Sequence, residues 1–149
     1  MPNTKQIVIV GCGRLGGTLA NRLSSQGHRL IVIDRKESAF DKLSYDFSGF
    51  KIIGDAVELH VLEQAQIKNA DCLFATTTQD NANLMIAQVA KTIFNVPRVV
   101  ARVFDPMRES IYREFGIETI SPTKLSAEAF LKMLEDQAHV NENHHHRRR

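Results

Sequence analysis

The sequence predicts an α/β protein built around a parallel sheet. Short apolar runs rich in β-branched residues alternate with stretches of helical periodicity, which is typical of repeated strand–helix–strand units. The runs IVIV at 7–10, LIVI at 30–33 and VVARV at 99–103 are nearly continuous in apolar residues, as strands covered on both faces are. A cluster of glycines follows the first run directly and leads into a helical pattern.

Six strands and the helices between them follow from these patterns. The expected strands are Gln6–Val10, Arg29–Asp34, Phe50–Ile53, Cys72–Ala75, Arg98–Val103 and Glu118–Ile120. Leu15, Leu19 and Leu23 share one face of the first helix. A longer stripe marks a later helix, and both stripes are expected to be core: Ala82, Met85, Ile86, Val89, Ala90 and Ile93.

Helix ends are also marked. Asp105-Pro106 and Ser121-Pro122 each place a capping side chain before a proline at the first helical position, where the missing N–H costs nothing. Gly27 is expected to end the first helix.

The last helix carries two apolar stripes. One contains Ala127, Phe130, Leu131 and Leu134, and the other contains Leu125, Ala129 and Met133. We expect one stripe to pack on its own domain and the other on a partner, because exposed apolar patches mark interfaces. A wide footprint within the chain is the alternative. The expected organisation is therefore a domain over 1–121, a helix at a dimer interface over 122–138, and a disordered tail over 139–149, where NENHHHRRR has no apolar periodicity.

Composition excludes several classes of function. The formal net charge is +2, and Arg147–Arg149 alone supply three positive charges, so the rest of the chain lacks the positive excess of a nucleic-acid binder. No run approaches the ~18 to 20 apolar residues of a membrane span. Cys12 and Cys72 lack the spacing of a disulfide framework or metal site, and the tail histidines are expected to bind metal only adventitiously. With its polar start at Met1–Gln6 the chain is expected to be soluble and cytoplasmic.

Gly11, Gly13 and Gly16 form the pattern G-x-G-x-x-G between a strand and a helix. The first glycine permits a tight turn, the second lets backbone amides approach a phosphate, and the third allows the helix to pack closely on the strand. The free N–H groups and the helix dipole then favour a diphosphate. This context predicts a Rossmann-like, doubly wound, six-stranded parallel sheet that binds a nucleotide. A tight turn without a ligand is the alternative.

Asp34 ends the second strand, 23 residues after Gly11. A carboxylate at this place accepts hydrogen bonds from a ribose diol and repels a 2′-phosphate, which favours NAD or an adenine nucleotide over NADP. Arg35 could partly offset that discrimination or pack over the adenine. A solvated strand end is the alternative.

Other polar residues follow strands at the same edge of the sheet. Asp55 could accept a hydrogen bond from the adenine amino group, and Arg102 could contact a phosphate. Thr76 and Thr77 follow the fourth strand. A helix cap at Asp55, a turn at the threonines and a surface ion pair at Arg102 are the alternatives.

Cys12 lies between the glycines, near a helix N-terminus that could lower the pKa of its thiol. A redox switch and a small side chain that fills the loop are both open interpretations.

With these residues, the sequence resembles the RCK N-terminal domain, also called the TrkA-N or KTN domain, of potassium-transport regulatory proteins. The resemblance runs from IVIVGCGRLGGTLANRLSSQGHRLIVIDR through GDAVELHVLEQAQIKNADCLFATTTQDNANLMIAQVAK to VVARVFDPMRESIYREFGIETISPTKLSAEAFL. Asp80 and Asn83 after the fourth strand add to its specificity. Asn81 departs from the pattern, because the family commonly has an acidic residue there.

The resemblance implies a Rossmann fold that binds NAD(H) or ATP, ADP or AMP and passes the binding state to a membrane potassium channel or transporter. It implies paired domains, often stacked into rings, with the last helix crossing to the partner. The implied contacts are phosphates at Gly11, Gly13, Arg14, Leu15, Gly16 and Arg102, ribose at Asp34 and Arg35, adenine at Asp55 and Ala56, and the far wall at Thr76 and Thr77.

We therefore expect a cytoplasmic, homodimeric, nucleotide-sensing regulatory subunit without catalytic turnover, associated with the inner face of the membrane through its transporter. A small NAD-dependent oxidoreductase is one alternative. It would need a proton-transfer group beside the nicotinamide, and the sequence has no Tyr-x-x-x-Lys, while His28 and His60 lie away from the carboxyl ends of strands. A redox-responsive nucleotide-binding regulator unrelated to transport is the other.

Overall fold

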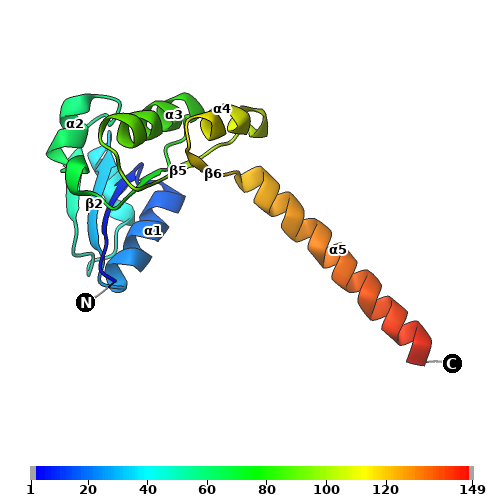
Figure 1. Ribbon diagram of the computed structural model, residues 1–149. Helices are drawn as coiled ribbons and strands as arrows, with labels where there is room; N and C mark the ends of the chain where they lie inside the picture. Colours follow the sequence, from blue (N-terminus) through cyan, green and yellow to red (C-terminus); the bar gives the residue numbers. More distant parts are fainter. Residues whose placement is uncertain (1–2, 148–149) are drawn as a thin grey trace.

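The chain folds around one parallel sheet, as predicted (Figure 1). The computed structural model describes residues 3–147. Its strands are β1 (Gln6–Val10), β2 (Arg29–Asp34), β3 (Phe50–Ile53), β4 (Cys72–Ala75), β5 (Arg98–Arg102) and β6 (Glu118–Ile120). All neighbours are parallel, in the order β3-β2-β1-β4-β5-β6. The predicted fold class is therefore confirmed, and only β5 ends one residue earlier than expected.

Helices connect these strands. The α-helices are α1 (Arg14–Ser25), α2 (Leu59–Gln64), α3 (Asp80–Gln88), α4 (Glu109–Glu114) and α5 (Pro122–Arg147). Short 3₁₀ segments are η1 (Glu37–Lys42), η2 (Ile67–Asn69) and η4 (Pro106–Arg108), and α3 continues into the π-helical turn η3 (Val89–Ile93).

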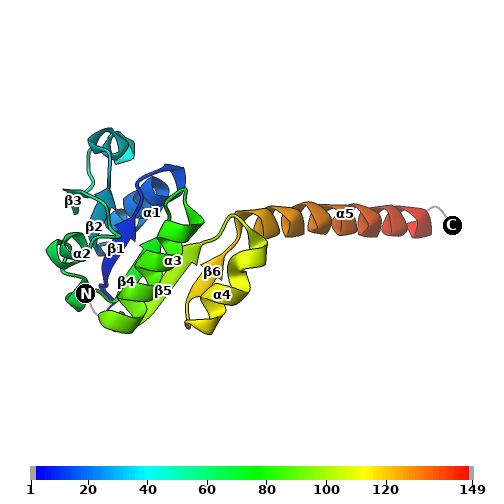
Figure 2. The ribbon, with the colours of Figure 1, turned by 90° about the horizontal axis from the view of Figure 1, so that it is seen from above.

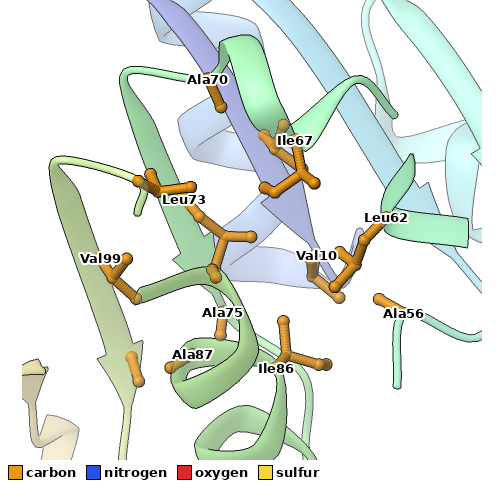
Figure 3. Close-up of a cluster of buried hydrophobic side chains, with 14 of the residues drawn as sticks. Val10, Ala56, Leu62, Ile67, Ala70, Leu73, Ala75, Ile86, Ala87 and Val99 are labelled. Carbon is orange, nitrogen blue, oxygen red and sulfur yellow. The ribbon is translucent and has the colours of Figure 1, made fainter. Parts of the chain in front are cut away.

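Alternate residues of the strands build two cores, one on each face of the sheet. Ile7 and Ile9 of β1 pack with residues of α1 and η1. Val8 and Val10 face the larger core, which includes residues of α2, α3 and α4, such as Ile86 (Figure 3). Each fully buried side chain of this kind contributes about 1.5 to 3 kcal/mol relative to exposure. Because both faces are covered, the strand sequences are continuously apolar.

The order of the strands creates a switch point at the centre of the sheet. β1 and β4 lie side by side, although β2 and β3 come between them in the chain. From β1 the chain winds outward to β3, and from β4 it winds outward to β6 in the opposite direction. Ligands of open α/β sheets bind outside the carboxyl ends of the strands at such a point.

Two of the predicted apolar stripes are only partly buried. In α1 the buried residues are the small ones, Gly16, Gly17 and Ala20, while the three predicted leucines are half-buried beside them. Along α3 and η3, Met85 and Ile93 are exposed, so their assignment to the core is wrong. The π-helical turn is wider than an α-turn, which shifts the end of the stripe away from the sheet.

The predicted helix-capping residues act as caps. A carboxylate oxygen of Asp105 accepts the N–H of Met107 at 3.0 Å, and the hydroxyl oxygen of Ser121 accepts the N–H of Lys124 at 3.3 Å. Gly27 follows α1 with φ of +89°, a left-handed conformation that glycine adopts without strain.

Helix α5 points away from the sheet (Figures 1 and 2). Its large apolar side chains Leu125, Phe130, Leu131, Met133 and Leu134 are between 53% and 76% exposed. The expectation that one apolar stripe packs on its own domain is therefore wrong, because the direction of the helix carries both stripes away from the body.

The end of α5 also differs from the expected organisation. The helix continues to Arg147 rather than ending near residue 138, and residues 123–147 contain no glycine or proline to stop it. Residues 148–149 of the expected tail lie outside the described residues.

A partly buried ion pair ties the first turn of α5 to the domain. Lys124 Nζ lies 2.6 Å from Oε1 of Glu109 in α4, and the hydroxyl of Thr119 in β6 donates to Glu109 Oε2 at 2.7 Å. The Lys124 ammonium and the Thr119 hydroxyl lower the pKa of the Glu109 carboxyl below its usual value, although burial acts in the opposite direction. This arrangement needs the ionised carboxylate.

The Glu109→Gln variant should be less stable than the unmodified protein by roughly 1 kcal/mol near neutral pH, because Lys124 loses its charged partner but stays half in water. Since the folded-state pKa of Glu109 is lowered, its carboxylate stabilises the fold above the ordinary glutamate pKa. That contribution disappears as the pH falls through the lowered value. Urea unfolding between about pH 7 and about pH 3 measures the difference, which should shrink toward acid.

The control is Glu114→Gln, an exposed position on the same helix, which should show no pH-dependent loss. A Glu109→Gln difference that stays constant across this pH range contradicts the role of the ion pair.

Candidate functional site

A cavity of about 640 Å³ opens at the carboxyl edge of the sheet. Most of the residues predicted to bind the nucleotide line it: Gly11, Gly13, Asp34, Arg35, Asp55, Ala56, Thr76, Thr77 and Arg102. They come from the ends of five strands, which meet because the carboxyl ends of parallel strands share one edge. Val10 and Ile86 of the larger core, beside Ala56, also belong to the lining (Figure 3).

Arg14, Leu15 and Gly16 do not line this cavity. They form the first turn of α1, where backbone N–H groups have no partner one turn back within the helix. What this turn can offer a phosphate is therefore its backbone N–H groups.

Two of the three motif glycines have no room for a side chain. Gly11 has φ of +96°, and a Cβ there would lie 2.9 Å from the backbone of Thr76. A Cβ on Gly16 would lie only 1.7 Å from the carbonyl oxygen of Gly11. Gly13 differs, because a Cβ there would meet nothing within 4 Å, and the residue faces the cavity. The first and third glycines thus permit packing, while the second leaves space that a ligand can enter.

The Asp34 carboxylate is oriented by two backbone N–H groups. Cys12 donates to Oδ2 at 2.8 Å and Lys36 donates to Oδ1 at 2.9 Å, which ties the end of β2 to the glycine loop. A carboxylate oxygen accepts more than one hydrogen bond. Both oxygens therefore keep the capacity to accept hydrogen bonds from a ribose diol.

Charged side chains surround the rim of the cavity. Arg35 Nε lies 3.9 Å from Asp55 Oδ2 in an exposed pair of little energetic weight. Asp55 Oδ1 also accepts the backbone N–H of Val57, two residues later, at 3.1 Å in the turn before α2. The alternative that Asp55 caps this helix is wrong, because α2 begins after Glu58 without a side-chain cap. Lys36 and Lys42 line the cavity too. Sequence reasoning missed these two lysines because no motif distinguishes them from other surface lysines.

Thr76 and Thr77 form the wall after β4, and their hydroxyl hydrogens are used within the protein. Thr76 Oγ1 lies 2.9 Å from the carbonyl oxygen of Val10 and 3.0 Å from that of Gly11, to which it donates. Thr77 Oγ1 donates to Asn83 Oδ1 at 2.6 Å. These side chains therefore fix the shape of the wall.

Arg102, at the end of β5, brings a positive charge to the cavity. Its Nη2 donates to the carbonyls of Thr76 and Thr77 at 2.6 and 3.1 Å, and its guanidinium lies 4.6 Å from the centre of the Phe104 ring. Its Nε is buried without a hydrogen-bond partner, and burial lowers the pKa of the guanidinium. Among residues 3–136, whose side chains the structure describes, no carboxylate pairs with Arg102, so the ion-pair alternative is wrong. The charge is available to an anion.

Cys12 is buried in the core on the α1 side. Burial, followed by the nearby Asp34 carboxylate, raises the pKa of its thiol, which is the opposite of the lowering that a helix N-terminus would cause. A protonated, buried thiol fills the loop and does not favour a redox switch.

A second cavity, of about 580 Å³, lies beside the amino ends of β2 and β3, at the opposite edge of the sheet. Its lining includes His28, Arg29 and Lys51, but not the glycine loop. Because ligands of open α/β sheets bind at the carboxyl edge, the cavity at the glycine loop is the candidate site.

No helix in the described part of the chain is long and apolar enough to cross a membrane. The described residues also contain no group of three or more His, Cys, Asp or Glu side chains that could hold a metal ion. The histidines at 144–146 lie outside the residues whose side chains the structure describes.

Comparison with known proteins identifies relatives of this sequence. The TrkA-N domain family matches residues 7–122. The Trk system potassium uptake protein TrkA of Streptomyces coelicolor is 38% identical over 128 residues, which cover 86% of this chain and 57% of that protein. A TrkA homolog of Methanothermobacter thermautotrophicus is 33% identical over 128 residues, which cover 86% of this chain and 59% of that protein. The chain thus spans somewhat more than half the length of these relatives.

Solved structures share the fold. The Kef CTD of Shewanella denitrificans in AMP bound form has a TM-score of 0.76 at 26% identity, over 93% of this chain and 87% of that one. The GsuK RCK domain has a TM-score of 0.77 at 27% identity, over 92% of this chain and 29% of that one. These relatives confirm the resemblance that the sequence indicated. The family match over residues 7–122, together with the six-stranded parallel sheet and its glycine loop, shows that the chain belongs to the TrkA-N domain family.

Proposed function

We propose that the chain is a nucleotide-sensing regulatory subunit, or the nucleotide-binding part of one, that controls a potassium channel or transporter. The proposed ligand is NAD(H) or an adenine nucleotide. The observation that carries the proposal is the open space at Gly13 beside the oriented Asp34 carboxylate. A helix N-terminus behind a glycine loop favours a diphosphate, and a carboxylate at the end of the second strand favours a ribose diol.

The names of relatives support the link to potassium transport in the proposal. The curated relatives are named as TrkA proteins of a potassium uptake system, and one similar domain is described with AMP bound. The chain spans just over half the length of those relatives. The cavity supports the binding of a nucleotide, whereas the proposed control of potassium transport is supported by membership of the family.

The predicted residues divide the proposed ligand between them. Backbone N–H groups of Gly13, Arg14 and Leu15 receive the phosphates, with Gly11 and Gly16 shaping the loop, while Arg102 supplies charge. Asp34 and Arg35 hold the adenosine ribose region, Asp55 and Ala56 contact the adenine, and Thr76 and Thr77 form the far wall.

The lining of the cavity favours sensing over catalysis. A dehydrogenase needs a proton-transfer group beside the nicotinamide. Among the described residues, the lining has no histidine or tyrosine, and the Cys12 thiol in it is fully buried.

In the proposed mechanism, the ligand binds one arrangement of the protein more tightly than another. The difference between the two affinities sets how far the ligand shifts the equilibrium between these arrangements.

We also propose that α5 binds a second copy of the chain, giving a homodimer that can assemble further into a ring. The exposed apolar side chains of α5 support this, since a lone helix gains nothing by exposing them to water. In this arrangement the protein lies in the cytoplasm, at the inner face of the membrane that holds its transporter partner.

A thermal-shift panel with NAD⁺, NADH, NADP⁺, ATP, ADP and AMP tests the ligand class. A bound ligand at about 100 times its Kd should add about 2.7 kcal/mol, which raises Tm by several degrees. The Gly13→Ala variant should fold with a loss of no more than about 1 kcal/mol, since its methyl group meets no protein atom. It should lose the ligand shift, because that methyl group occupies the space that phosphates approach. Absence of any shift, or an equal shift in Gly13→Ala, contradicts the proposed pocket.

Asp34→Ala tests the ribose site. Loss of the carboxylate should weaken NAD⁺ about tenfold or more and reduce the preference for NAD⁺ over NADP⁺, because the acceptor and the repulsion of a 2′-phosphate disappear together. Titration calorimetry measures both affinities, and Asp46→Ala, an exposed position outside the cavity, is the control. Unchanged selectivity would remove Asp34 from the ligand site.

The double variant Phe130→Glu/Leu134→Glu tests the proposed dimer. These side chains lie one helical turn apart and are 76% and 69% exposed, so charges there should convert the dimer to monomers in sedimentation velocity. Lys132→Glu, on the same exposed segment, is the control and should remain dimeric. A double variant that stays dimeric places the interface elsewhere.

A further inference from the structure

Asn83 in α3 is fully buried, at 0% exposure, and does not line the cavity. Its Oδ1 accepts the N–H of Thr77 at 3.0 Å and the Thr77 hydroxyl at 2.6 Å. Its Nδ2 donates to the carbonyls of Thr77 at 3.1 Å and of Arg102 at 3.0 Å. An asparagine amide offers two donors and one oxygen with two lone pairs, so all of its capacity is used. A buried polar group satisfied in this way holds its partners in one arrangement.

These bonds join β4 to β5 beyond the end of their paired residues. The β4–β5 register ends where Ala75 lies opposite Ala101. Thr77, two residues beyond Ala75, and Arg102, directly after Ala101, both line the cavity. Asn83 reaches from α3 to both of them and so continues the connection between the strand ends where the sheet itself stops.

One carbonyl group links Asn83 to the charge in the cavity. The Thr77 carbonyl oxygen accepts from Asn83 Nδ2 and also from Arg102 Nη2, each at 3.1 Å. The second anchor of Arg102 Nη2 is the Thr76 carbonyl at 2.6 Å, in the same short segment. No carboxylate pairs with Arg102 among the side chains that the structure describes, so these two carbonyls are the hydrogen-bond acceptors that orient its guanidinium, which also lies over the Phe104 ring.

We propose that Asn83 is a positioning residue for the anion-binding part of the cavity: it fixes the Thr77 carbonyl, which in turn holds the Arg102 guanidinium where a ligand phosphate binds. This inference rests on the proposed nucleotide function, because the anion is the phosphate of that ligand. Asn83 itself touches no ligand. A purely structural residue would weaken all ligands alike, whereas a residue that positions Arg102 affects ligands according to their phosphate charge.

The Asn83→Ser variant tests this in the full chain. Titration with ADP should show affinity reduced about tenfold or more, because a charge-assisted contact is lost, while affinity for adenosine changes less than about twofold. Asn81→Ser on the same helix is the matched control, since the Asn81 side chain bonds Arg108 and does not line the cavity. Equal losses for ADP and adenosine overturn the proposal.

A double variant distinguishes a role of Asn83 in positioning Arg102 from a general role in packing. In the Arg102→Ala protein, adding Asn83→Ser should cause no further loss of ADP affinity, because the group that Asn83 positions is gone. A loss of undiminished size in that background overturns the proposal.

A measurement without ligand distinguishes this inference from the proposed function. Proton exchange at the buried Arg102 Nε–H, followed by NMR in the ligand-free protein, should become about tenfold faster or more in Asn83→Ser. If no nucleotide binds the unmodified protein, the proposed function fails, and an unchanged exchange rate separately overturns the role of Asn83. Asn83→Thr replaces the serine variant in all three experiments if that variant does not fold.

Discussion

The close approach of helix α1 to the end of strand β1 is the contact on which the rest of the site depends. A Cβ on Gly16 would lie 1.7 Å from the Gly11 carbonyl oxygen, and the Gly11 backbone in turn packs against Thr76. Only the absence of two side chains lets β1, α1 and β4 meet at one point. Their meeting places the first N–H groups of α1 at the switch point of the sheet, where backbone donors and the helix dipole attract an anion. Without this contact the cavity would lose both its shape and its donors.

Around this contact the polar groups of the cavity wall are hydrogen-bonded within the protein, and the charged side chains of the lining have a net positive charge. Backbone N–H groups orient the Asp34 carboxylate, and the hydroxyl hydrogens of Thr76 and Thr77 are used internally. The charged side chains of the lining are Asp34, Asp55, Arg35, Lys36, Lys42 and Arg102, so cations outnumber carboxylates. A cavity whose walls are fixed by internal hydrogen bonds, but whose charge is not balanced from within, suits an anionic ligand better than a neutral one.

The cavity and the base of α5 lie close together in space. Val103, next to Arg102, donates its N–H to the carbonyl of Ile120 at 2.9 Å, and Ile120 is followed directly by Ser121, which caps α5. The Glu109–Lys124 ion pair fixes the next turn. The charged wall of the cavity and the start of the proposed partner helix are therefore joined by a short run of hydrogen bonds. This proximity is a spatial link between the two parts of the structure.

The sequence by itself determined the strands, the glycine loop, the helix caps and the place of Asp34, because these features depend on periodicity and spacing within short segments. The tertiary structure decided what depends on distant neighbours. Asn83 was no more than a feature of the family pattern until α3 placed it between two strand ends, 0% exposed. Burial raised the pKa of the Cys12 thiol and so decided between the two interpretations that the sequence left open, and the direction of α5 exposed Phe130 and its neighbours. A local sequence pattern shows which interactions a residue is able to make. Which of its polar groups stay unpaired, and which of its atoms stay exposed, depends on the residues that folding places in contact with it.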